Sequence, residues 1–102
     1  MGITPTQFFM SMWGKKGDVL SGGRQMPSHW SARHLNLLSL SSPVADHVPQ
    51  AAGIALAEKI KHATGLVSAD EALRVTLVNL GEGATSMGDW HEGLNWAGIH
   101  NL

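Results

Sequence analysis

Three consecutive residues, Gly81, Glu82 and Gly83, form the part of the sequence best suited to chemistry. They follow an apolar run at residues 73–80, whose β-branched and aliphatic side chains predict a buried strand, and they precede a helical pattern. Glycines let a ligand approach the backbone, a helix start offers unpaired N–H groups, and a carboxylate binds a hard cation. The segment therefore predicts a place that holds a phosphate group together with its metal ion.

Two other interpretations of this segment stay open. Two glycines around an acid are commonly no more than a turn, and a small phosphate-binding α/β domain would use the same three residues. No lysine follows the turn at the spacing of a Walker-type phosphate loop, so that kind of nucleotide site is excluded.

The segments around the turn predict an α/β fold, in which a helix and a loop precede a β-α-β-α unit. Thr4 and Pro5 suit a helix start, Gly14 suits its end, and residues 14–32 lack any period and form a long loop. Two strands joined through a long helix pair in parallel, with helices covering the sheet. The predicted elements are a strand at 35–40, a helix at 46–64, a strand at 73–80 and a helix at 88–99.

Parallel strands of such a sheet bind ligands at their carboxyl ends. Ser41, Ser42 and Pro43 follow the first predicted strand, as the glycine-rich turn follows the second. Both groups of residues are therefore expected to meet at one edge of a single sheet.

Side-chain spacing also predicts which residues are buried. Apolar residues three and four apart give the helix at 46–64 one buried face, and charged residues near its end are expected in solvent. Ser86 and Asp89 resemble a capping box for the last helix. The predicted face is Val48, Ala51, Ala52, Ala55, Leu56 and Ile60, the solvated residues are Glu58, Lys59 and Lys61, and a core cluster is predicted at Phe8, Phe9, Met12 and Trp13.

Length and composition limit the classes of protein. The chain has 102 residues, which predicts a single partial domain at 1–102 with a small core. Its formal charge of −1 points to neither nucleic acid nor an anionic membrane as partner, and no cysteine is present for disulfides or thiolate chemistry. No apolar stretch is long enough to cross a bilayer and no basic signal-peptide region is present, so a cytoplasmic location is expected.

Three stretches of the chain resemble a known family in the same order. Residues 80–95 resemble the thiamine-diphosphate signature in the alpha subunit of 2-oxo acid dehydrogenase complexes, from the Gly-Glu-Gly turn to the Asp-Trp-His-Glu segment. Residues 22–29 are similar to its Gly-Arg-Gln-Met-Pro-x-His loop, and residues 41–53 to its Ser-Ser-Pro stretch. Arg-Gln-Met-Pro and Gly-Glu-Gly point to the branched-chain, 2-oxoisovalerate dehydrogenase type.

The resemblance implies a cofactor and roles for individual residues. Thiamine diphosphate would supply the chemistry, and Mg²⁺ would bridge its diphosphate to Glu82. Backbone N–H groups of Gly81, Gly83 and Ala84 would contact the phosphates. Further residues match positions around the aminopyrimidine ring (Ser42 and Val44), a potassium-binding turn (Ser41 and Pro43) and, as a catalytic candidate near the substrate, His29.

The resemblance also implies partners and shows departures. The family acts with a beta subunit and a lipoyl-bearing acyltransferase in the oxidative decarboxylation of branched-chain 2-oxo acids. Asp46 and His47 replace a polar pair that helps to hold potassium, which puts that ion in doubt. An asparagine ligand of Mg²⁺ lies further along the family's chains, so these residues are interpreted as an internal fragment or truncated form, inactive alone. The alternative is a non-catalytic remnant that binds only a beta-type subunit.

Overall fold

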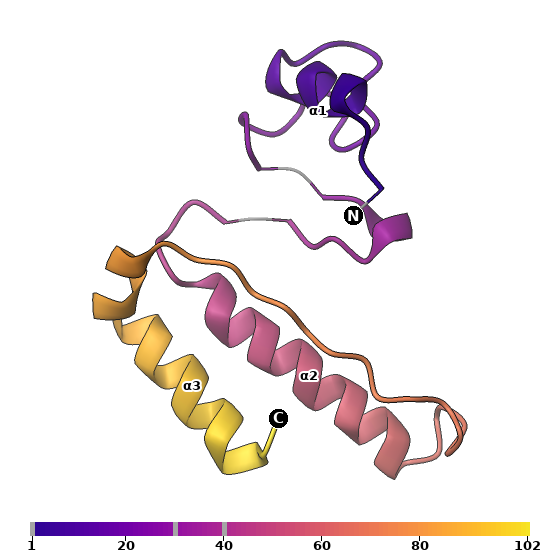
Figure 1. The fold of residues 1–102 in the computed structure, drawn as a ribbon, viewed down its shortest axis with the longest axis vertical. Helices are drawn as coiled ribbons and strands as arrows, with labels where there is room; N and C mark the ends of the chain where they lie inside the picture. Colours follow the sequence, from indigo (N-terminus) through magenta and orange to yellow (C-terminus); the bar gives the residue numbers. More distant parts are fainter. Residues whose placement is uncertain (1, 30, 40) are drawn as a thin grey trace. The chain divides into compact units, whose positions relative to one another are not determined.

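The computed structural model describes residues 2–29, 31–39 and 41–102 and divides the chain into two compact units, 1–42 and 43–102 (Figure 1). The division falls within the Ser-Ser-Pro stretch, directly after Ser42. That the whole chain forms one partial domain stays a prediction.

The first unit begins with the predicted helix, α1, at Pro5–Met12. Thr4 is its N-cap, and a full capping box forms because the Thr4 hydroxyl accepts from the Gln7 backbone N–H while the Gln7 side chain accepts from the Thr4 N–H. The helix ends at Met12 with Trp13 as its C-cap, and Gly14 follows with a φ of 57°, a left-handed conformation that suits glycine. The predicted helix and both of its ends are confirmed.

The predicted core cluster on α1 is wrong for two of its aromatic residues. Phe9 is 49% exposed and Trp13 is 69% exposed. The Phe9 ring packs against those of Trp13 and Phe8, with centroids 5.4 Å apart in each pair, and both Phe9 and Trp13 still face solvent.

Residues 14–32 form the predicted loop, and a buried carboxylate organises it. Asp18 accepts hydrogen bonds from the Leu20, Ser21 and Gly23 backbone N–H groups and from the Ser21 hydroxyl, at 2.7–3.2 Å. Burial raises the pKa of the Asp18 carboxyl, but the hydrogen bonds from Ser21, Gly23 and Leu20 outweigh it and lower the pKa from 3.8 to about 2. The loop that leads into Arg24-Gln25-Met26-Pro27 is therefore held by an ionised carboxylate.

Acid should loosen this loop in a defined range of pH. Because the pKa of Asp18 is lower in the folded chain, its contribution to stability is complete above about pH 4 and is lost as the pH falls through about 2. We expect the amide proton shifts of Leu20, Ser21 and Gly23 to titrate together with a midpoint near pH 2. Asp18→Asn should abolish that titration, and a midpoint near 3.8 in the wild type would contradict this account.

The strand predicted at residues 35–40 is not formed over the residues that the structure describes there, 35–39. Arg33–Leu35 is instead a short 3-10 helix, η1, and Asn36 follows with a φ of 53°. This left-handed residue turns the chain, and within the described residues 31–39 a single antiparallel bridge forms, between Ala32 and Leu37. Leu40 lies outside the described residues.

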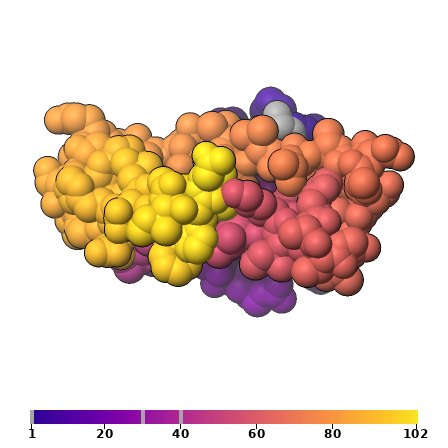
Figure 2. All heavy atoms as spheres, turned by 90° about the horizontal axis from the view of Figure 1, so that it is seen from below, coloured from indigo at the N-terminus to yellow at the C-terminus, as the bar shows by residue number. Residues whose placement is uncertain are grey.

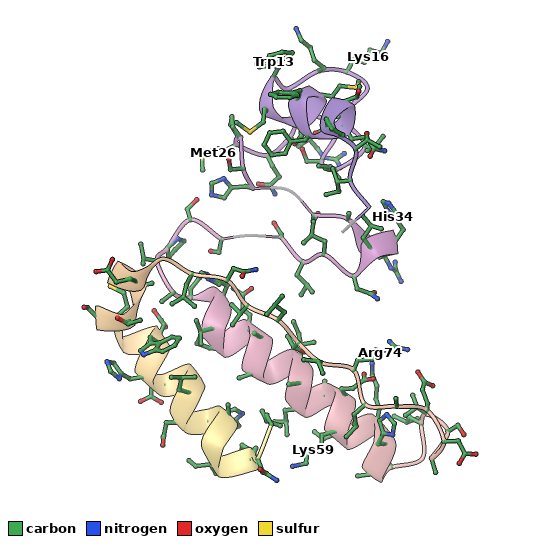
Figure 3. The ribbon with its side chains drawn as sticks, viewed as in Figure 1. Trp13, Lys16, Met26, His34, Lys59 and Arg74 are labelled. Carbon is green, nitrogen blue, oxygen red and sulfur yellow. The ribbon has the colours of Figure 1, made fainter. Side chains whose placement is uncertain are left out.

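The second unit contains two longer helices, α2 at His47–Ala63 and α3 at Gly88–His100, which confirm the predicted helices. They lie side by side and run in the same direction (Figure 1). Val48 near the start of α2 lies against Gly93. The ammonium group of Lys59, whose side chain is labelled in Figure 3, donates to the His100 and Asn101 carbonyls at the end of α3.

Residues 73–80 return along α2 in the opposite direction. Asn79 lies beside His47 at the start of α2, and Arg74 lies beside Glu58 near its end. The segment is extended but has no strand partner among the described residues, and Val75 is 93% exposed. Figure 2 shows atoms of this part of the chain along one edge of the unit, beside those of α2 and α3. The predicted α/β class stays a prediction, because an extended segment becomes a strand only by pairing.

Two details of the predicted burial and capping are wrong in this unit. Glu58 is only 7% exposed, because Arg74 and Lys61 lie within 3.8 Å of its carboxylate. Ser86 does not cap α3: it ends a 3-10 helix, η2, at Glu82–Ser86, and Met87 is the N-cap without a side-chain hydrogen bond. The predicted face of α2 is buried at Val48 and Ala52, whereas Ile60 at its far end is half exposed.

The helix contact at Gly93 should be sensitive to a single methyl group. A Cβ at Gly93 would lie 2.7 Å from Val48 Cγ1 and 3.0 Å from the Pro49 backbone nitrogen. We expect Gly93→Ala to lower the free energy of unfolding by about 1–3 kcal/mol through overpacking. Gly98→Ala, on the same helix with nothing within 4 Å, should instead raise it by up to about 1 kcal/mol. Equal melting temperatures for the two variants would contradict the packing described here.

None of the helices in the described part of the chain has the length and hydropathy to cross a membrane.

Candidate functional site

The glycine-rich turn is held on one side and open on the other. Gly81 is the N-cap of η2, and its carbonyl accepts from the Ala84 N–H at 3.0 Å. Ala84 is buried and packs with Ala45 and Val48, and Val78, Leu80 and Trp90 surround this small core. Gly81, Glu82 and Gly83 are exposed. A buried alanine thus anchors a turn whose other residues face solvent.

The two glycines are not explained by the chain's own structure. Gly81 has a φ of −78°, neither glycine has a positive φ, and a Cβ at either position would meet nothing within 4 Å. Backbone strain and close packing, the two usual reasons for glycine, are therefore both missing among the described residues. Both glycines therefore border open space in the described chain.

The Glu82 carboxylate fits the role of a metal ligand but supplies only one ligand residue. It is exposed, and no hydrogen bond or ion pair within the described residues engages it. No group of three or more His, Cys, Asp or Glu side chains gathers anywhere in the described chain. Mg²⁺ prefers six oxygen ligands, so Glu82 would bind it together with phosphate oxygens and water.

The predicted phosphate contacts of the turn stay a prediction, and its backbone hydrogen bonds show which N–H groups are engaged within the chain. The Ala84 N–H donates to the Gly81 carbonyl, so it is engaged within the turn rather than free for a phosphate. The Glu82 and Gly83 N–H groups, at the start of η2, have no such backbone acceptor in the described chain.

His29 and Ser42, predicted separately, are brought together in the first unit. The Ser42 hydroxyl lies 2.8 Å from His29 Nε2, and His29 Nδ1 lies 3.0 Å from the Pro27 carbonyl. Because that carbonyl can only accept, Nδ1 carries a proton, and in the neutral imidazole Nε2 then accepts from the Ser42 hydroxyl. The imidazole thus fixes the direction of the serine hydroxyl, a pairing that the sequence distance of 13 residues did not suggest.

That Ser41 and Pro43 belong to a potassium-binding turn stays a prediction. Ser41 is half-buried in the first unit, and Pro43 and Val44 are exposed in the second. His47 Nε2 bonds instead to the Asn79 carbonyl at 2.9 Å. That the Ser42 and Glu82 motifs meet at one edge stays a prediction, because they belong to different units.

Sequence reasoning missed the roles of two residues. Asp18, which organises the loop before Arg24, could have been found from its Asp-x-x-Ser spacing just ahead of two glycines. His47 was treated only as a departure from the family pattern, and no sequence signal indicates its bond to Asn79, 32 residues away.

An open groove about 250 Å³ in volume lies between α2 and α3, apart from these residues. It is lined by Pro49, Gly53, Glu92, Gly93 and Trp96. None of the predicted site residues lines it.

A family model described as Dehydrogenase E1 component matches residues 1–102. The chain belongs to this family. The resemblance to branched-chain 2-oxo acid dehydrogenase alpha subunits is thereby confirmed, since the similar proteins carry that description.

Three relatives illustrate the similarity. The chain is 42% identical over 101 residues to the 2-oxoisovalerate dehydrogenase subunit alpha of Bacillus subtilis, covering 99% of this chain and 28% of the relative. It is 38% identical over 98 residues to the mitochondrial subunit alpha 1 of Arabidopsis thaliana, covering 96% of this chain and 19% of the relative. It is 39% identical over 94 residues to the human mitochondrial subunit alpha, covering 91% of this chain and 19% of the relative. The chain therefore spans less than a third of the length of these relatives.

Proposed function

We propose that these residues contribute half of a thiamine diphosphate and Mg²⁺ site in a branched-chain 2-oxo acid dehydrogenase alpha subunit. The proposal rests on the glycines at positions 81 and 83. Neither backbone conformation nor packing within the described chain requires a glycine there, and the Glu82 carboxylate between them has no partner among the described residues. A diphosphate that approaches the backbone and a metal ion that needs a carboxylate account for all three residues.

The residues would act by binding and orienting. Glu82 would hold Mg²⁺, and the Glu82 and Gly83 N–H groups would donate to phosphate oxygens. The Ser42 hydroxyl, which donates a hydrogen bond to His29, would accept one from an amino group of the aminopyrimidine. Val44 would contact the same ring. The thiazolium of the bound cofactor supplies the carbanion chemistry of decarboxylation.

Partners belong to the same proposal. A beta subunit would complete the site, and a lipoyl-bearing acyltransferase would receive the acyl group. The exposed apolar side chains of residues 73–77 support contact with further protein, because such patches commonly mark interfaces.

A chimera tests this function against the alternative of a non-catalytic remnant. The aligned region of the Bacillus subtilis alpha subunit is replaced by residues 1–102, and carbon dioxide release from 2-oxoisovalerate is measured with the beta subunit present. We expect the chimera to be active and residues 1–102 alone to be inactive, because Glu82 is the one metal-ligand residue offered by the described turn. A folded chimera that binds the beta subunit but releases no carbon dioxide would favour the remnant.

A further inference from the structure

One side chain connects the start of α2 to the end of the extended segment that leads into the turn. His47 Nε2 lies 2.9 Å from the Asn79 carbonyl, and Asn79 stands two residues before Gly81. The His47 side chain is 18% exposed, and Val48 beside it is buried against Ala84. The His47 ring therefore joins the start of α2 to the segment that precedes the turn, next to the small core that contains Val48 and Ala84.

The bond has a defined chemical direction. A carbonyl oxygen can only accept, so His47 Nε2 must carry a proton. The other ring nitrogen, Nδ1, is buried without a hydrogen bond, 3.8 Å from the equally unpartnered Asp46 Oδ1. The imidazole thus has a single strong partner, the Asn79 carbonyl.

The remaining anchors of the extended segment are weaker or more distant. The ion pairs of Arg74 lie at its far end, and the Arg74 side chain is 63% exposed, so solvent screens them. Val78 and Leu80 are only partly buried. No backbone hydrogen bond within the described chain fixes residues 73–80.

We infer that His47 is a positioning residue: its N–H bond to the Asn79 carbonyl sets where Gly81, Glu82 and Gly83 stand relative to α2. The inference rests on the proposed function for its consequence, the placement of the Glu82 carboxylate. The restraint itself follows from the contacts alone.

Amide exchange in the 102-residue chain tests the restraint. Ala84 reports on the turn, because its N–H is bonded to Gly81 and buried with the core. His47→Met has a similar length without an N–H donor, whereas His47→Gln keeps a donor. We expect exchange at Ala84 to be about fivefold to tenfold faster in His47→Met, on the scale of one lost hydrogen bond, and close to wild type in His47→Gln.

A matched control removes another imidazole from the same helix. His62 lies near the far end of α2, and His62→Met should leave exchange at Ala84 unchanged. Protection within the middle turns of α2 and α3 should be the same in all variants, which shows that the unit remains folded. Unchanged exchange at Ala84 in His47→Met, or equally fast exchange in His47→Met and His47→Gln, would overturn the inference.

A binding titration separates this inference from the proposed function. Inorganic diphosphate with Mg²⁺ is titrated into the Bacillus subtilis chimera and into the same chimera with each His47 variant, because residues 1–102 alone supply only half of the proposed site. Weaker binding in His47→Met than in His47→Gln supports both statements. If exchange responds as expected but no variant binds Mg²⁺ and diphosphate, the positioning role stands and the proposed function fails.

Discussion

Replacing Glu82 with alanine is expected to abolish Mg²⁺-dependent thiamine diphosphate binding in the Bacillus subtilis chimera that carries these residues. Glu82 is the only acidic side chain of the turn, so its loss leaves the diphosphate and its metal without a protein carboxylate. Removing a group that only supports a metal ligand can lower metal affinity by on the order of a hundredfold. Removing a ligand itself should lower it by at least as much. Titration calorimetry with and without Mg²⁺ measures the effect.

The control for Glu82→Ala is a second exposed acid outside the turn. Asp70 lies in the connection between α2 and the extended segment, so Asp70→Ala removes the same charge without touching the turn. It should bind cofactor as the wild type does. Equal affinity of wild type and Glu82→Ala would show that Glu82 is not the metal ligand.

The second large effect concerns the exposed extended segment. Residues 1–102 alone should self-associate, because Val75 and Leu77 are 93% and 75% exposed on a segment with unpaired backbone groups. Val75→Lys with Leu77→Lys should convert the chain to a monomer, since charges on an edge oppose pairing. Sedimentation velocity over a range of concentrations measures the change.

An exposed leucine outside the segment provides the comparison. Leu66 is 76% exposed in the turn after α2, and Leu66→Lys should leave the association of the chain unchanged. A wild-type chain that sediments as a monomer at all concentrations would refute this prediction.

Local signals predicted the helices well. The cap at Thr4, the apolar spacing from Val48 to Ala52 and the pattern after Gly88 each act within one or two helical turns, and all three helices are present. Local signals were not sufficient to predict the structure of residues 73–80. Their composition suits a strand, but pairing depends on a partner that the described residues do not supply.

The candidate site was predictable residue by residue but not as an arrangement. The chemistry of Glu82 and its flanking glycines could be inferred from residue types alone. The bond between Ser42 and His29 joins residues 13 positions apart, and no local pattern in the sequence indicates that these two side chains meet. Similarly, Glu58 was expected in solvent because nothing local indicates that Arg74 would cover it.

Replacing Mg²⁺ with paramagnetic Mn²⁺ tests the central claim most directly, because Mn²⁺ broadens NMR signals of nearby protons. The measurement follows the amide signals of Gly81, Gly83 and Ala84 in the chimera. We predict that they broaden when Mn²⁺ and thiamine diphosphate are both present, and that they stay sharp in Glu82→Ala. Broadening centred elsewhere in the chain, or the same broadening in Glu82→Ala, would contradict a cofactor site at this turn.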